Sequence, residues 1–240
     1  MMRFTRTALL LALALAASAR AVAAQTIPSP YRHIEQTKSV GLFGGYLFTD
    51  PDIGLTDSTS LPIGPQSGPL FGARFQFRAS GPLSLEGSVG VSPTDRRLFG
   101  VVTLPDSSIG APVDLETTVP ATLVMGDVGV RFHLTGARTW NGLAPFVVGT
   151  GGLAADVRGT LDEEDVVREE ALFRFGPSFA VGAGLGTDWF PTSNASIRIE
   201  AAGRLMRMST PNAFLGGNPN AERSEWNPAV SVSVGGAFHF

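Results

Sequence analysis

The chain has 240 residues with a formal net charge of −3, 43% hydrophobic residues, 29 glycines, 17 prolines and no cysteine. The hydrophobic content excludes a disordered chain, and the charge excludes the strongly basic surface typical of nucleic-acid-binding proteins. The lack of cysteine excludes a disulfide framework and a lipid-modified N-terminal cysteine. We therefore expect a single folded domain with no nucleic-acid partner.

The N-terminus has the pattern of an export signal. Two arginines within the first six residues precede an apolar run of ten residues, and small residues follow up to Ala24. This pattern predicts a secretory signal peptide over residues 1–24, cleaved after Ala23 or Ala24, with an apolar run too short to span a membrane as a helix. We interpret residues 25–37 as a short, flexible periplasmic leader and residues 38–240 as the folded domain.

Eight segments of that domain alternate between apolar residues and small or polar residues, which is the period of a β-strand with one apolar face. In chain order they are Lys38–Thr49, Leu70–Ala79, Leu83–Ser92, Thr122–Leu134, Leu143–Ala155, Ser178–Phe190, Ala195–Met208 and Val230–Phe240. Each has about ten residues or more, which is enough for a tilted strand to cross a bilayer.

The second segment shows the alternation most clearly. Phe71, Phe75 and Phe77 fall on one face, and Arg74 and Arg78 fall on the other. A shift by one residue would place both arginines in lipid, at a cost of about 2–4 kcal/mol each near the midplane. The register of this strand is therefore strongly specified.

The fifth segment has apolar residues on both faces, which weakens the signal for its register. We place Phe146 and Val148 on the lipid face, opposite Gly149 and Gly151 on the inner face. Val147 then joins the small residues inside.

The connections between the segments alternate between long and short. Long links occupy residues 50–69, 93–121, 156–177 and 209–228, and short links occupy residues 80–82, 135–142 and 191–194. This order is typical of a barrel with external loops, internal turns and both termini in the periplasm. We therefore predict an all-β fold, an eight-stranded antiparallel up-and-down transmembrane β-barrel. Residues 98–104 are expected to extend one hairpin above the membrane.

The predicted outer faces carry charge at strand ends alone, at Lys38 and Arg207. Alternation also fits a soluble barrel with its apolar face turned inward, so a soluble periplasmic lipocalin-like binder is one alternative. Aromatic residues favour the membrane reading, because they would form two girdles. One rim would carry Phe77, Phe132, Phe146, Trp189, Phe238 and Phe240, and the other would carry Tyr46, Phe48, Phe71 and Phe179.

The predicted inner faces carry nine charged residues of nearly balanced sign: Arg74, Arg78, Arg131, Arg198 and Arg204 against Glu86, Asp127, Asp188 and Glu200. Eight strands leave a lumen that side chains fill, and buried charges need partners. We expect a lumen plugged by salt bridges. A narrow porin-type channel for small solutes is the alternative.

With these features the chain resembles the small outer-membrane barrel superfamily that includes the OmpA transmembrane domain and OmpX. The resemblance covers Lys38 to Phe240 and rests on the signal peptide, eight strands, loop alternation and terminal Phe240. It implies a monomer in the outer membrane, in contact with membrane lipid and lipopolysaccharide. It also implies that the last strand, with Val234, Gly236, Phe238 and Phe240 on one face, is an assembly signal for the barrel assembly machinery.

We expect no enzymatic activity, cofactor or metal. His33, His133 and His239 lie where no hydrolase arrangement of serine, histidine and carboxylate is predicted, and the acidic residues 161–165 lack the ligand spacing of a calcium loop. The expected role is structural or interactive, carried by the long external loops, which are the candidate site for an extracellular ligand.

Overall fold

The computed structural model describes residues 29–56, 59–103, 110–158, 173, 175–211 and 224–240. The predicted signal peptide, the first residues of the leader and the acidic residues 161–165 lie outside these ranges. Among the described residues there is no helix long and apolar enough to cross a membrane. The strands are β1 (Tyr31–His33), β2 (Lys38–Thr49), β3 (Ile53–Thr56), β4 (Thr59–Leu61), β5 (Gly68–Ser80), β6 (Leu83–Thr103), β7 (Gly110–His133), β8 (Arg138–Trp140), β9 (Leu143–Asp156), β10 (Ser178–Trp189), β11 (Ala195–Ser209) and β12 (Ser224–His239).

Eight long strands close into an antiparallel barrel, which confirms the predicted fold class. Each pairs with the next long strand along the chain, in the order β2, β5, β6, β7, β9, β10, β11 and β12, and β12 returns to pair with β2. At the closing seam, the Phe240 amide donates to the Lys38 carbonyl at 2.9 Å, and the Lys38 amide donates to the Phe240 carbonyl at 3.1 Å. The terminal aromatic residue is therefore held at the seam of the barrel.

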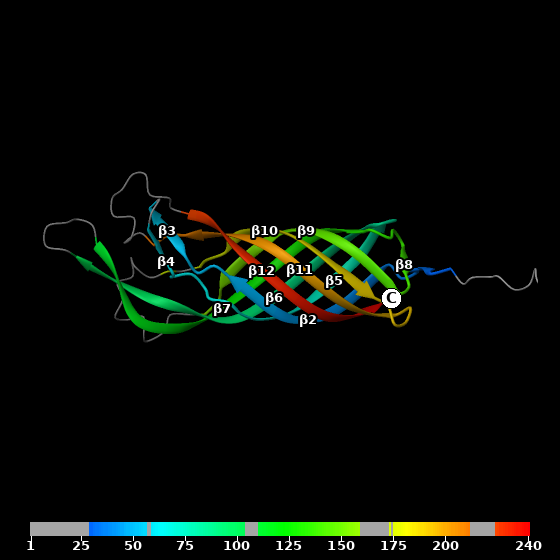
Figure 1. Cartoon of the computed structure of the whole chain (residues 1–240), viewed down its shortest axis with the longest axis horizontal. Coiled ribbons are helices and arrows are strands. Elements are labelled where there is room, and N and C mark those ends of the chain that lie inside the picture. Colours follow the sequence, from blue (N-terminus) through cyan, green and yellow to red (C-terminus); the bar gives the residue numbers. More distant parts are fainter. Residues whose placement is uncertain (1–28, 57–58, 104–109, 159–172, 174, 212–223) are drawn as a thin grey trace, which may run out of the picture.

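The two ends of the barrel differ, as Figure 1 shows. The short links and the C-terminus lie at one end, here called the turn end, and the long links lie at the other, here called the loop end. Short turns face the periplasm in outer-membrane barrels, so we expect the turn end to face the periplasm.

The loop end is extended by strands that continue beyond the barrel. β6 and β7 pair as far as Thr103 opposite Gly110, so most of the link predicted at residues 93–121 forms a long hairpin (Figure 1). A register shift between Arg97 and Phe99 interrupts this hairpin. The link before β5 contains the small hairpin of β3 and β4.

The leader is docked rather than flexible over its described part. β1 pairs with β8, and the Ile34 amide donates to the Ala137 carbonyl at 2.9 Å. Between β8 and β9, Asn141 and Gly142 both have positive φ, the conformation that a two-residue hairpin turn requires. The Asn141 amide in turn donates to the Pro30 carbonyl at 2.8 Å. Sequence reasoning missed this docking because a three-residue strand has too little periodicity to detect.

Candidate functional site

A network of charged side chains fills the turn half of the lumen. Its centre is Arg131 of β7, a fully buried side chain. The Arg131 guanidinium donates to the Glu86 carboxylate, to Asp188 at 3.3 Å and to the Gln76 amide oxygen at 3.0 Å. It also lies 3.7 Å from Glu200. Because the alternation of each strand turns these residues inward, β5, β6, β7, β10 and β11 together supply one connected cluster.

Arg198 of β11 binds the same acceptors from the other side. It donates to Asp188 at 2.6 Å, to Glu86 at 2.8 Å and to Gln76 at 2.9 Å. The uncharged Gln76 therefore accepts a hydrogen bond from both arginines, a role that a search for charged residues alone does not reveal.

Arg74 of β5 completes the network. Its Nη1 lies 2.8 Å from Glu200 and 3.8 Å from Glu86. Three arginines, Arg74, Arg131 and Arg198, thus face three carboxylates, Glu86, Asp188 and Glu200. Formal charges in the cluster cancel, which is the condition for holding so many ions out of water.

Phe146 belongs to this network and not to the exterior. Its ring is 1% exposed, with the Arg131 guanidinium 3.9 Å and the Arg198 guanidinium 5.2 Å from the ring centre. The predicted register of the fifth segment was therefore wrong: Phe146 and Val148 point inward, and Val147 and Leu153 point outward. The physical reason is cation–π attraction in a desolvated site, which favours an aromatic ring beneath two guanidinium groups.

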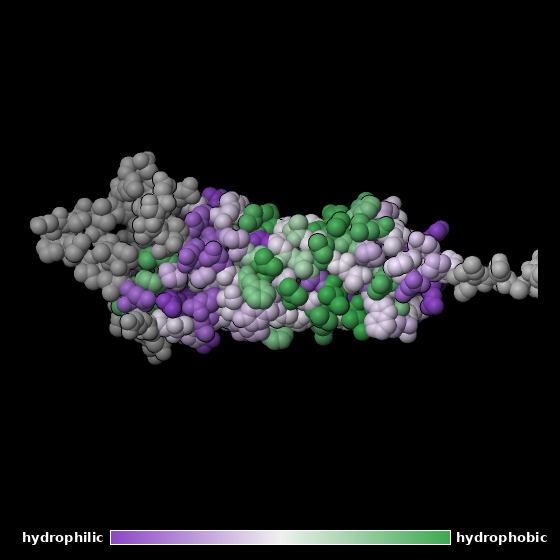
Figure 2. All heavy atoms as spheres, viewed as in Figure 1, coloured by the Kyte–Doolittle hydropathy of each residue, from purple (hydrophilic) through white to green (hydrophobic). Residues whose placement is uncertain are grey.

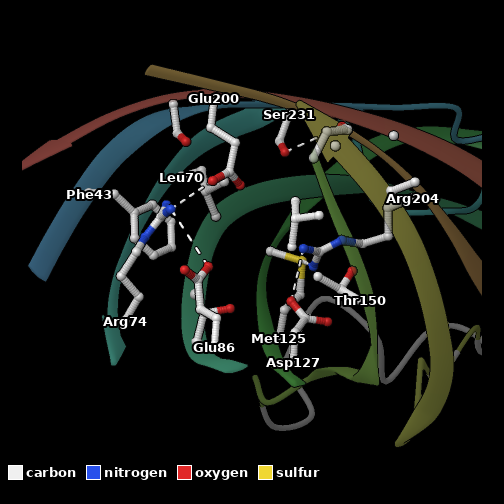
Figure 3. Close-up of a pocket in the computed structure, with 18 residues that line it drawn as sticks. Phe43, Leu70, Arg74, Glu86, Met125, Asp127, Thr150, Glu200, Arg204 and Ser231 are labelled. Atoms are coloured by element: carbon white, nitrogen blue, oxygen red, sulfur yellow. Dashed lines mark hydrogen bonds and ion pairs between the residues drawn. The ribbon is translucent and has the colours of Figure 1, made fainter. Parts of the chain in front are cut away.

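A second, separate pair lies nearer the loop end. Arg204 Nη2 lies 2.9 Å from Asp127, and Arg204 Nη1 donates to the Met125 sulfur at 2.9 Å. Figure 3 shows this pair on one side of a small cavity and Arg74 with its two carboxylates on the other. The cavity has a volume of about 40 Å³, which is enough for a few water molecules.

Arg78 does not join the network. Its guanidinium donates to the Ile34 carbonyl at 2.5 Å, and its amide donates to the Thr37 carbonyl at 2.7 Å. Among the nine predicted lumen charges, Arg78 is thus the one that fastens the leader to the turn end. The buried Ile34 side chain lies at this junction.

The structure brings together a serine and a histidine that the sequence analysis kept apart. Ser196 Oγ and His239 Nε2 are 2.7 Å apart, and both residues are buried. Within the described part of the chain, no carboxylate hydrogen-bonds to the other ring nitrogen of His239, as a hydrolase triad requires. His133 likewise serves the interior, with Nε2 3.8 Å from Asp188. The geometry is that of buried packing, closed to a substrate.

An apolar layer fills the loop half of the lumen, which the sequence analysis did not predict. Inward side chains of the barrel strands form most of it, including Leu47, Leu70, Leu123, Met206 and Met208. Three residues from the long links, Ile63, Phe173 and Phe175, pack into the same core. The Asp156 amide donates to the Phe175 carbonyl at 2.8 Å, which holds that link against the end of β9.

The exterior is apolar around the middle of the barrel. Figure 2 shows hydrophobic side chains gathered there on the face in view, with hydrophilic residues towards the loop end. Outward aromatic residues are exposed, and they include Tyr46, Phe48, Phe71, Phe77, Phe132, Phe179, Trp189, Phe238 and Phe240. Val234 and Gly236 share their face on β12. Such an exterior is stable in lipid and unfavourable in water.

Among the described residues, no group of three or more histidine, aspartate or glutamate side chains is placed to bind a metal ion. The four arginines and four carboxylates described above bind one another.

No family model and no curated protein matches the sequence. Similar folds occur among solved structures. OprG of Pseudomonas aeruginosa, an outer-membrane protein, has a TM-score of 0.51 and 12% identity over 85% of this chain and 97% of its own. AlkL, an outer-membrane protein, has a TM-score of 0.49 and 10% identity over 90% of this chain and 96% of its own. Neisserial surface protein A has a TM-score of 0.47 and 12% identity over 85% of this chain and 97% of its own.

At these identities the likeness shows the fold alone. The chain has the fold of the small eight-stranded outer-membrane β-barrels, as the resemblance to OmpA-like and OmpX-like proteins predicted. The closed antiparallel barrel and the apolar exterior agree with that class, and the outer membrane is its location.

Proposed function

We propose that this protein is a closed outer-membrane barrel whose role is interaction at the cell surface through its four long loops. The observation that carries the proposal is the filled lumen. A neutralised network of three arginines and three carboxylates occupies its turn half, and an apolar core occupies its loop half. A barrel filled in this way is a rigid support, and the loops it displays are where binding specificity can reside.

The narrow porin alternative receives little support from the lumen. A conducting pore needs a continuous path of water, whereas the cavity between the two ion-paired groups has about 40 Å³. On each side of that cavity an arginine and a carboxylate from different strands are paired, Arg74 with Glu200 and Arg204 with Asp127. The soluble lipocalin-like alternative fails for another reason, because the large apolar residues face outward and the charges face inward.

The proposal also includes the absence of enzymatic activity. The buried Ser196 and His239 side chains are the nearest approach to a catalytic pair, and they lack both an orienting carboxylate and an exposed position for a substrate. Membrane lipid, lipopolysaccharide and the assembly machinery are the partners that a barrel of this class requires, and an extracellular ligand would bind the loops. A monomer suffices, since the barrel closes on itself.

Complementation of a strain that lacks the protein tests this role. One plasmid carries the full chain, and another carries a chain in which residues 159–172 and 212–223 are replaced by short glycine–serine turns. Heat-modifiable gel migration of outer-membrane fractions checks that both barrels insert equally. We expect the full chain alone to restore the missing phenotype. Equal restoration by both chains would exclude a role for these two loops, and equal restoration when residues 53–60 and 100–113 are replaced as well would place the role in the barrel and contradict the proposal.

A further inference from the structure

The docked leader covers the turn end of the lumen. Figure 1 shows the leader, in blue, at that end of the barrel. Within residues 31–37, the side chain of Ile34 is buried, Gln36 is half-buried, and the other five residues are exposed. Residues 31–37, here called the strap, are therefore a single layer of chain with one buried anchor.

A very small gap separates the strap from the charged network of the lumen. Ile34 and Gln36 line this gap from the strap. Gln76, Asp188 and His239 line it from the lumen. Its volume is about 10 Å³, which leaves room for one water molecule at most. Asp188 is 1% exposed although β10 ends one residue later, so the strap helps to keep water from its carboxylate.

The strap is fastened more weakly than the barrel strands. It pairs with β8 over three residues, whereas β2, which follows it, pairs with β12 over eleven. Besides that pairing, the Ile34 amide donates to the Ala137 carbonyl at 2.9 Å. Arg78 donates to the Ile34 carbonyl at 2.5 Å and to the Thr37 carbonyl at 2.7 Å. Segments with few buried apolar contacts open locally at a lower free energy than the rest of a fold, so the strap can open while the barrel stays closed.

We propose that the strap is a lid that controls the entry of water to the charged network from the turn end. In the closed state, the buried Ile34 side chain seals the mouth of the lumen. In the open state, the strap leaves as a unit, and water reaches Asp188 and the arginines paired with it. Two opposing effects set the balance, because hydration of buried ions favours the open state and burial of Ile34 favours the closed state. The lid lies at the opposite end of the barrel from the long loops, so it operates whether or not the loops bind a ligand.

Thiol labelling of the whole mature chain in lipid nanodiscs tests the lid, because the chain contains no cysteine of its own. Ser39→Cys places a thiol beneath the strap, at a residue that is 4% exposed and lines the gap. Ser193→Cys places a thiol on an exposed turn at the same end of the barrel. A charged methanethiosulfonate reagent should modify position 39 about a hundredfold more slowly than position 193, because position 39 reacts in the open state alone.

Two substitutions should open the lid. Ile34→Ser removes the buried anchor, and Arg78→Gln removes the charged donor to the Ile34 carbonyl. Each should speed labelling at position 39 about tenfold or more. Tyr31→Ser is the matched control, because Tyr31 is an exposed residue of the same strap. Ser92→Cys reports on the loop half of the lumen, where the buried Ser92 is opposite Leu123, and its labelling should not change with Ile34→Ser.

Heat-modifiable gel migration checks that each variant is a folded barrel, and Arg78→Gln decides the test if Ile34→Ser does not fold. Labelling as fast at position 39 as at position 193 would show that the strap does not cover the mouth. Equal labelling of position 39 in the opening variant and in Tyr31→Ser would show that the anchor does not hold a lid. Equal acceleration at positions 39 and 92 would show that the whole barrel opens. Each of these three results would overturn the proposal.

Discussion

The Arg131 guanidinium lies 3.9 Å from the centre of the Phe146 ring, and both side chains are almost completely buried in the barrel. The Arg131 guanidinium needs interaction partners at its edge and on its face, because burial removes the water that would otherwise solvate its charge. Glu86, Asp188 and Gln76 hydrogen-bond to its edge, and the ring of Phe146 covers its face. The Arg131–Phe146 contact therefore links the charged network of the lumen to an apolar side chain.

Phe146→Leu should lower the free energy of unfolding by about 1–3 kcal/mol, because leucine keeps apolar volume but loses the attraction to the cations. Urea unfolding of the barrel refolded in lipid vesicles, followed by tryptophan fluorescence, measures this change. Phe132→Leu is the control, since Phe132 points outward. Equal effects of the two substitutions would contradict the inward position of Phe146.

Arg131→Met should cost about 3–5 kcal/mol, since it leaves Glu86 and Asp188 buried with one cation fewer. Arg97→Met is the matched control. Arg97 pairs with Asp114 at 3.5 Å on the exposed hairpin, and exposed pairs contribute about 0–1 kcal/mol. The same unfolding assay measures both. A cost for Arg131→Met no greater than that for Arg97→Met would show that the network contributes nothing to stability.

The sequence predicted the eight strands and their inward charges because period-two alternation is a local signal that single residues such as Arg74 and Arg78 make unambiguous. The prediction of inner and outer faces failed at β9, because apolar residues occur on both of its faces. Phe146 and Val148 lie on one face and Val147 lies on the other. There the choice depends on Arg131 and Arg198, which come from other strands.

The apolar layer and the docked leader were also missed, for related reasons. Ile63, Phe173 and Phe175 enter the lumen from long links, and a contact between a loop residue and a distant strand leaves no periodic pattern. The leader pairs with β8 over three residues, too few for alternation to appear. Such long-range contacts become visible in the folded structure alone.

Gly186→Ala should destabilise the barrel by about 1–3 kcal/mol through overpacking. A Cβ on Gly186 would lie 2.7 Å from the Phe146 ring and would also clash with the Ile199 carbonyl. Gly149→Ala should be nearly neutral, because a Cβ there meets no atom within 4 Å on the lipid side. Thermal unfolding monitored by heat-modifiable gel migration compares the two. Greater damage from the Gly149 substitution would reverse the inner and outer faces assigned to β9 and β10.

Phe240→Ala should reduce the amount of barrel assembled in the outer membrane of cells, while refolding of the purified protein into vesicles changes little. The reason is that an assembly signal acts through recognition, whereas an exposed aromatic residue on the lipid face acts through membrane contact. Phe48→Ala is the control, because Phe48 is exposed to a similar degree on β2. Equal assembly of the two variants in cells would assign Phe240 to membrane contact alone.

A closed lumen is the basis of the proposed role, and single-channel recording in planar bilayers tests the closure most directly. The whole mature chain is reconstituted at a density at which a known porin gives many open channels. We predict no stable open state, because the network of Arg131 and Arg198 and the apolar core around Met206 fill the barrel. A reproducible conductance step with a long open lifetime would contradict the closed lumen and favour the narrow porin.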